Sequence, residues 1–310
     1  FAYDMFGYND TKQAGPHREY ATDLVNQLWG INLMGLQTWN SIRALDFLET
    51  LPEVDRSRLA CTGGSGGGTQ TFMLGLVDDR LAAQAPCVMV SHSMQGGCLC
   101  ENAPGLRVQF SNMEISAAVA PRPQMLVAAT GDWTKTTLEI EGPGIRSAYR
   151  ALGAPTSVDY VLHDFGHNYN LATRESVYGF FNKWFHTDAP KAEVKELAYT
   201  KEPDEKLLFL TGGKTPDSPV SRDGLIQYLK RQTHKALIAA KPTDAKSLKR
   251  YQKKMRLVWE RSLQLPVGLS KVLSEKLGQA EKAKDAWQRS YEITPTELLR
   301  EKLNPAKKEG

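Results

Sequence analysis

The sequence has little cysteine and no long apolar run. Only four of its 310 residues are cysteine, which is too few, and too unevenly spaced, for a domain built on a disulfide framework. Apolar residues never continue unbroken for the length of a membrane span, so the sequence predicts no membrane partner. The remaining composition, 41% hydrophobic and 24% charged, is typical of a globular protein.

The four cysteines also give little support for a metal. Cys61 and Cys87 fall in strand-like runs and fit the pattern of small buried apolar groups. Cys98 and Cys100 form a C-x-C pair, but no second Cys or His pair stands at the spacing of a zinc site. We therefore expect structural cysteines, no bound metal and no cofactor.

Charge is unevenly distributed along the chain. Residues 1–190 contain 13 Lys and Arg against 19 Asp and Glu, a net −6, whereas residues 191–310 contain 26 against 16, a net +10. With the change in composition, this predicts a core at 1–190, a charged linker with one short strand at 191–220, and a basic helical region at 221–310. A basic half can attract an acidic partner. No nucleic-acid-binding motif accompanies the charge, so we expect an amphipathic appendage and no nucleic acid.

Strand-like and helix-like segments alternate over the first 190 residues. Repeated βα units with short apolar strands predict an α/β fold, a mostly parallel sheet with helices on both faces. Expected strands cover residues 1–5, 58–64, 82–91, 123–130 and 157–164, with one more at 207–213. Expected helices cover about 19–51, 69–79, 142–153, 174–186, 223–240 and 245–263.

One serine stands among five glycines in the stretch CTGGSGGGTQ at residues 61–70. Each glycine costs about 0.5–1 kcal/mol inside regular structure, so such a cluster persists where the backbone is sharply bent or closely approached. The G-x-S-x-G pattern lies between an expected strand and an expected helix, which is the context of a nucleophile elbow. A phosphate-binding loop is the alternative, but its lysine and the acidic residue of a dinucleotide fingerprint are missing. We interpret Ser65 as a nucleophile.

Two further residues follow expected strands. Asp132 comes after the strand at 123–130, and His167 after the strand at 157–164. The carboxyl ends of parallel strands share one edge of the sheet, where ligands bind. A serine nucleophile needs a base, and the base needs an orienting carboxylate. Either residue alone could cap a helix or pack, but the order Ser, Asp, His is that of the α/β-hydrolases.

The segments TGGSGGGTQTF, ATGDWT and DFGHNY resemble the α/β-hydrolase superfamily, in particular bacterial acetyl xylan esterases and dienelactone hydrolases, over about residues 1–190. The resemblance implies that Ser65 is the nucleophile, His167 the general base and Asp132 its orienting acid. It also implies that the backbone N–H of Gly66 is one donor of the oxyanion hole.

Other expectations depend on the same resemblance. In that family the second oxyanion donor comes from a loop after opening strands that this sequence lacks. We therefore expect the full polypeptide to begin before Phe1, or a second chain to complete the sheet. Glu101 is an alternative acid, and Gln95 is a possible polar contact of the substrate pocket. Trp133 could stack on a sugar ring or pack beside a helix start.

These features predict a serine esterase that forms an acyl-enzyme. Its expected substrate is a small-molecule or carbohydrate ester, with a short acyl group such as acetyl on a carbohydrate-type alcohol. A peptidase of the same fold is an alternative, because the three residues do not distinguish an amide from an ester. A catalytically inactive hydrolase-like binding module is another. Localisation stays open, although the resemblance implies a periplasmic or secreted setting.

Overall fold

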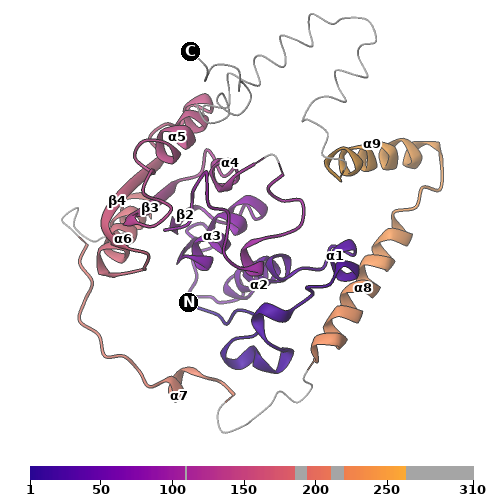
Figure 1. The fold of residues 1–310 in the computed structure, drawn as a ribbon, viewed down its shortest axis with the longest axis horizontal. Coiled ribbons are helices and arrows are strands. Elements are labelled where there is room, and N and C mark those ends of the chain that lie inside the picture. The colour runs from indigo at the N-terminus through magenta and orange to yellow at the C-terminus, as the bar shows by residue number, and fades with distance from the viewer. Residues whose placement is uncertain (109, 186–193, 211–219, 263–310) are drawn as a thin grey trace, which may run out of the picture. The chain divides into compact units, whose positions relative to one another are not determined.

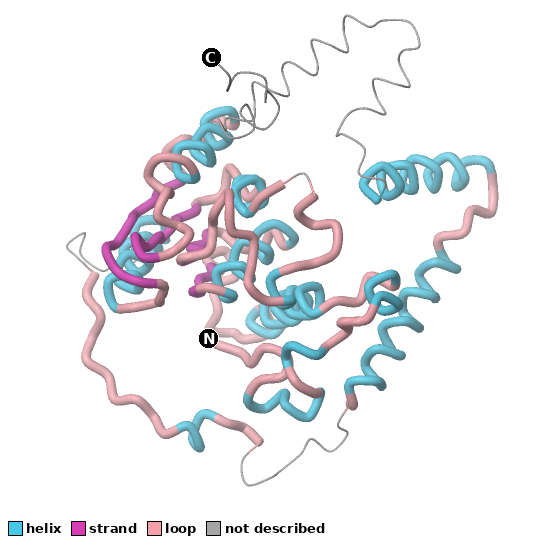
Figure 2. Tube along the Cα trace, in the orientation of Figure 1, coloured by secondary structure: helices cyan, strands magenta, loops and turns pink. Residues whose placement is uncertain are grey.

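The computed structural model describes residues 1–108, 110–185, 194–210 and 220–262, and the chain divides into two compact units, Phe1–Lys235 and Ala236–Gly310. The first unit holds a parallel sheet with the strand order β1-β2-β3-β4. Figure 1 labels β2, β3 and β4, and Figure 2 draws the strands in magenta. The predicted α/β fold with a mostly parallel sheet is therefore confirmed. The strands are β1 Ala60–Gly64, β2 Ala83–Cys87, β3 Gln124–Gly131 and β4 Val158–Gly166.

The register brings the carboxyl ends of all four strands to one edge. Gly64 of β1 pairs with Cys87 of β2, Cys87 with Val127 of β3, and Gly131 of β3 with Gly166 of β4. Loops that follow the strands therefore begin side by side along this edge.

Helices cover both faces of the sheet, as the alternation of side chains along each strand requires. On one face, side chains such as Cys87, Val127 and Ala129 pack against Val177 and Phe180 of α6. On the other, Leu126 and Val158 join the core formed with α2, α3, α4 and α5. These helices are α2 Leu33–Leu48, α3 Gly66–Val77, α4 Asn112–Ala117, α5 Glu141–Ala151 and α6 Leu171–Phe185.

The predicted strand at residues 1–5 is wrong. This segment has no strand pairing, and its polar side chains fasten it to α2 and to the turn that follows. Tyr3 donates a hydrogen bond to Ser41 Oγ at 2.6 Å, and the Asp4 carboxylate accepts from the Asn9 amide and the Asp10 backbone N–H. Two 3₁₀ turns follow, Asn9–Ala14 and His17–Glu19.

The single helix predicted over about 19–51 is also wrong. The chain forms α1 Leu24–Leu28 and then the longer α2, which begins after Asn32. Gly30 between them adopts a φ of 72°, and the Asn32 side chain accepts a hydrogen bond from the Gly35 N–H as the cap of α2. A left-handed glycine followed by a capping residue ends one helix and begins another.

The strand predicted at 207–213 is wrong over its described part. Leu207 ends the short helix α7 Asp204–Leu207. The backbone N–H groups of Phe209 and Leu210 then donate to the Asp10 carboxylate at 2.7 and 2.9 Å, so they have no strand partner. Residues 211–213 lie outside the described residues.

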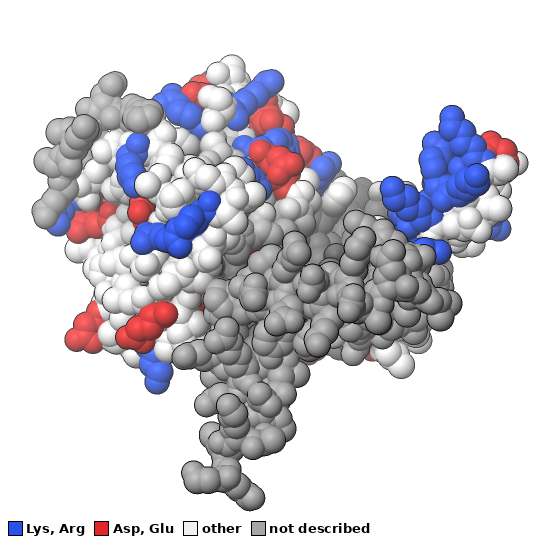
Figure 3. Space-filling model, turned by 90° about the horizontal axis from the view of Figure 1, so that it is seen from above, with Lys and Arg blue, Asp and Glu red and all other residues white. Residues whose placement is uncertain are grey.

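The basic region contains helix α8 Arg222–Ala239 and helix α9 Ala245–Ser262, while residues 263–310 lie outside the described residues. Ile226 of α8 is buried against Phe6 and Tyr20 within the first unit. Figure 3 shows Lys and Arg side chains, in blue, gathered on part of the visible surface. Among the described helices, none combines the length and apolar character needed to cross a membrane. Among the side chains of α9 whose burial is described, the exposed basic ones are Lys246, Lys249, Arg250, Lys253, Lys254 and Arg256.

Candidate active site

Ser65 lies at a sharp turn between β1 and α3. Its φ of 56° and ψ of −122° fall in a region that non-glycine residues rarely adopt. The Ser65 N–H donates to the Cys87 carbonyl at 3.1 Å, which holds the turn against the neighbouring strand. A Cβ added to Gly68 would stand 2.6 Å from that same carbonyl oxygen. The glycines thus allow α3 to pass close to the sheet behind the serine.

Asp132 and His167 are brought together at the same edge. His167 Nδ1 lies 2.8 Å from Asp132 Oδ2, and the side chains are 28% and 1% exposed, respectively. The second oxygen of Asp132 accepts from the backbone N–H and the hydroxyl of Thr134 at 2.6 and 2.5 Å. Because the ionised carboxylate can only accept, Nδ1 carries the proton in the neutral ring and Nε2 is free to act as a base.

The loop that carries His167 packs directly on the serine turn. Tyr169 lies against Gly64, where an added Cβ would stand 2.9 Å from Tyr169 Cβ. The Tyr169 hydroxyl lies 3.1 Å from Thr62 Oγ1 of β1, and burial raises the pKa of Tyr169 to about 12, so it is neutral near pH 7. This contact was missed from the sequence, since nothing local links Gly64 to a tyrosine a hundred residues away.

Trp133 packs between the His167 imidazole and the core. Its ring centroid lies 4.5 Å from that of His167, with an interplanar angle of 40°. The same indole packs against the core cluster beneath α5. Trp133 thus limits the orientation of the imidazole, and the sugar-stacking role stays a prediction.

Glu101 occupies a different position from the one expected of a triad acid. Its side chain accepts hydrogen bonds from the N–H groups of Gly97 and Cys98 at 2.7 and 3.0 Å. Its other oxygen lies 3.5 Å from where a Cβ of Gly66 would stand, at the first turn of α3. The carboxylate bonded to His167 is that of Asp132.

The backbone N–H of Gly66 is the first N–H of α3, so it has no acceptor within the helix.

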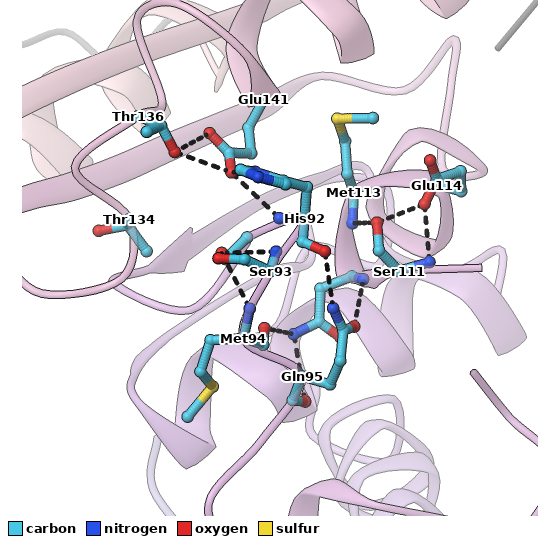
Figure 4. A network of polar contacts seen from close by, with 12 residues as sticks. His92, Ser93, Met94, Gln95, Ser111, Met113, Glu114, Thr134, Thr136 and Glu141 are labelled. Carbon is cyan, nitrogen blue, oxygen red and sulfur yellow. Dashed lines mark hydrogen bonds and ion pairs between the residues drawn. The ribbon is translucent and has the colours of Figure 1, made fainter. Parts of the chain in front are cut away.

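Gln95 braces the loop between β2 and α4 (Figure 4). Its amide nitrogen donates to the His92 carbonyl at 3.0 Å, and its amide oxygen accepts from the Asn112 N–H at 3.0 Å. Both ends of the side chain are therefore used within the loop. The role of Gln95 in a substrate pocket stays a prediction.

A second histidine–carboxylate pair, also missed from the sequence, lies in this network (Figure 4). His92 Nδ1 and the Glu141 side chain are 2.7 Å apart, and the Glu141 side chain is fully buried. The same carboxylate accepts from the His92 N–H and the Thr136 hydroxyl. The partners are 49 residues apart, at positions with no shared motif, so no sequence signal could have joined them.

Comparison with known proteins supports the fold. No family model matches the chain. A solved structure described as methylesterase BT1017 matches with a TM-score of 0.62 and 29% identity, over 76% of this chain and 53% of that one. A Bacillus subtilis (strain 168) protein named "Putative hydrolase YtaP" is 23% identical over 193 residues, covering 59% of this chain and 64% of its own length.

A glucuronoyl esterase of carbohydrate esterase family 15 from Caldicellulosiruptor kristjansonii matches at a TM-score of 0.46 with 18% identity, over 62% of each chain. The methylesterase and the putative hydrolase are the matches that carry weight, and the resemblance to α/β-hydrolase esterases is confirmed. The chain spans about half the length of the methylesterase and less than two thirds of YtaP.

Proposed function

We propose that the chain is a serine esterase, with Ser65 as nucleophile, His167 as general base and Asp132 as orienting acid. The observation that carries the proposal is the 2.8 Å contact between His167 Nδ1 and Asp132, in a loop that packs on the strained turn of Ser65. The likeness to a methylesterase at 29% identity supports the same reaction class.

In the first half of the reaction, Ser65 Oγ attacks the ester carbonyl carbon while its proton passes to His167 Nε2. The carbonyl oxygen becomes negative and accepts a hydrogen bond from the Gly66 N–H, which points from the start of α3. Asp132 stabilises the positive imidazole. The tetrahedral intermediate then expels the alcohol, which takes the proton from His167, and the acyl group stays on Ser65.

In the second half, water attacks the acyl-enzyme. His167 Nε2 accepts a proton from the water, and the Gly66 N–H again donates a hydrogen bond to the oxyanion. The intermediate collapses to release a carboxylic acid, and Ser65 regains its proton from His167. Each half uses the same base and the same orienting acid, so no further group is required for proton transfer.

The proposed substrate is a carbohydrate ester whose non-sugar part, either the acyl group or the alcohol, is small. An acetyl group on a sugar hydroxyl would leave acetate as the acid product. A methyl ester of a sugar carboxylate would release methanol instead, and the name of the similar methylesterase supports a methyl ester. Hydrolysis of either ester would use Ser65, His167 and Asp132. The two substrates differ only in whether the acyl group or the alcohol is small.

The proposal is tested by labelling the chain with a fluorophosphonate and locating the adduct by peptide mass spectrometry. We expect modification of Ser65, and turnover of p-nitrophenyl acetate that falls by about 10⁴-fold or more in Ser65→Ala. Ser147→Ala removes an exposed serine of α5 and is the matched control, with unchanged labelling and turnover. A folded chain that takes no label at Ser65 would overturn the proposal and favour an inactive binding module.

A second measurement separates the substrates. Acetate release from acetylated xylan oligomers and methanol release from methyl-esterified oligouronates are compared at equal enzyme concentration. The larger kcat/KM identifies the small group. Turnover of a peptide amide at a higher kcat/KM than either ester would replace the esterase with a peptidase.

A further inference from the structure

A cluster of possible metal ligands lies outside the residues proposed for catalysis. His17, Cys98 and Cys100 each offer one ligand atom, and these atoms all lie within 4.8 Å of one another. His17 belongs to a 3₁₀ turn near the start of the chain, and the two cysteines belong to the loop between β2 and α4. The sequence predicted no metal at the C-x-C pair because a third ligand was missing from its neighbourhood, and the fold supplies one 81 residues away.

The imidazole of His17 is held in the orientation that a ligand needs. Its Nδ1 lies 2.7 Å from the Phe6 carbonyl oxygen, which can only accept, so Nδ1 carries the proton and Nε2 has a free lone pair. Metal-binding histidines commonly use their other nitrogen in this way. Gly7, with a φ of 82°, packs so closely on the His17 backbone that an added Cβ would lie 2.4 Å from its backbone nitrogen. Tyr8 covers the ring at a centroid distance of 4.6 Å.

The sulfur ligands are held just as closely. Cys98 Sγ accepts the Cys100 N–H at 3.4 Å, and the Cys98 N–H donates to Glu101. Asn102 Nδ2 donates to the Cys98 carbonyl at 2.8 Å. These bonds form inside one short turn, so they fix the backbone that carries both cysteines, whose sulfur atoms lie within 4.8 Å of His17.

The distance between His17 Nε2 and Cys98 Sγ fits zinc. With Zn–S of about 2.3 Å and Zn–N of about 2.0–2.1 Å, two tetrahedral ligand atoms of these types stand about 3.6 Å apart. His17 Nε2 and Cys98 Sγ are 3.9 Å apart, within a few tenths of an ångström of that value. Thiolate and imidazole ligands favour zinc over magnesium or calcium, which prefer oxygen.

We propose that His17, Cys98 and Cys100 bind one zinc ion. Within the described residues no fourth protein ligand completes the cluster, so the fourth position is expected to hold water. The ion would join the start of the chain to the turn that carries Glu101, whose carboxylate lies beside Gly66. Zinc therefore stabilises the loop next to the proposed oxyanion hole, without entering the reaction.

The test is metal titration of the reduced, chelator-treated chain. Cobalt(II) serves as the spectroscopic probe, and zinc affinity is measured by competition with a chromogenic chelator. We expect one equivalent of cobalt with a thiolate-to-metal charge-transfer band that zinc abolishes. Cys98→Ser and Cys100→Ser should each lower the zinc affinity by at least about 100-fold, since even outer-shell changes cost 10–100-fold.

Two further variants keep the result interpretable. Cys61→Ser removes a cysteine outside the cluster and should bind zinc as the parent does. His17→Gln leaves both thiols in place, so it tests the site even where a cysteine variant fails to fold, and should weaken zinc while the thiolate band persists. Equal zinc affinity in the parent and in all three ligand variants would overturn the proposal, as would a reduced parent chain that binds neither metal. These readouts are independent of esterase activity.

Discussion

Two histidine–carboxylate pairs in the first unit have nearly the same geometry. His167 and Asp132 are 2.8 Å apart through Nδ1, and His92 and Glu141 are 2.7 Å apart through the same ring atom. Both carboxylates are almost completely shielded from solvent. By distance and burial alone, either pair could be the base and acid of a hydrolase.

Their surroundings distinguish them. His167 lies in a loop whose Tyr169 packs on Gly64, directly before the strained turn of Ser65. Glu141 is the first residue of α5, where a negative charge is stabilised by the helix N-terminus, and it accepts from the loop that follows β2. A histidine–carboxylate bond therefore does not define a catalytic site, and the neighbouring nucleophile does.

The largest effect predicted from this comparison is that of Asp132→Asn. The asparagine oxygen can still accept from Thr134, but its amide nitrogen then faces His167 Nδ1 and favours the wrong tautomer. We expect kcat for p-nitrophenyl acetate to fall by about 10³–10⁴-fold, with a thermal unfolding midpoint near that of the parent.

Glu141→Gln is the matched change in the other pair. It should cost about 1–3 kcal/mol of unfolding free energy, because His92 and Thr136 lose a charged acceptor in a buried place. The kcat should change less than tenfold. A loss of activity in Glu141→Gln as large as that in Asp132→Asn would contradict the assignment of the acid.

The catalytic candidates could be predicted from the sequence because parallel strands fix where they lie. Ser65, Asp132 and His167 each follow an apolar strand, and such positions share one edge of the sheet. The position of Tyr169, by contrast, depends on its contact with Gly64 of β1, about a hundred residues earlier in the chain. A pattern of neighbouring residues carries no information on such a contact.

The secondary structure shows the same difference between segments set by local sequence and segments set by particular contacts. The strands from β1 to β4 alternate with helices and are flanked by turn residues, so local sequence was enough to place them. The segments at 1–5 and 19–51, and the described part of the segment at 207–213, were predicted wrongly. Each is shaped by a particular side chain, as when the Asp10 carboxylate takes the backbone N–H groups of Phe209 and Leu210. Apolar composition alone could not distinguish these segments from strands or continuous helix.

An intermediate effect is predicted for Gly64→Ala, which tests whether the contact between Tyr169 and Gly64 positions His167. The new Cβ would stand 2.9 Å from Tyr169 Cβ, so the loop that carries His167 has to shift. We expect kcat to fall by about 10–100-fold, since a displacement of about 1 Å at a catalytic base is enough for that. The unfolding free energy should fall by about 1–3 kcal/mol.

Gly179→Ala is the control, because a Cβ there meets nothing within 4 Å on helix α6. It should leave kcat unchanged and raise stability slightly, since alanine is the better helix former. Parent-like activity in Gly64→Ala would show that the Tyr169 contact does not position His167.

The smallest effect is predicted for a partly buried ion pair that connects α6 to the segment after it. Hydrogen bonds from the Arg174 guanidinium to Glu196, at 2.5 and 2.7 Å, lower the pKa of that carboxyl to about 2. Since the folded-state pKa lies below the unfolded value of about 4.5, the pair stabilises the fold above about pH 4.5. That stabilisation is lost as the pH falls toward about 2.

Glu196→Gln removes this titration, so its unfolding free energy should fall less than that of the parent between about pH 5 and about pH 3. Urea unfolding at both pH values measures the difference, with Glu202→Gln, an exposed carboxyl paired with Lys206 on the same connector, as the control. Identical pH dependence in parent and Glu196→Gln would mean that the pair does not persist in solution.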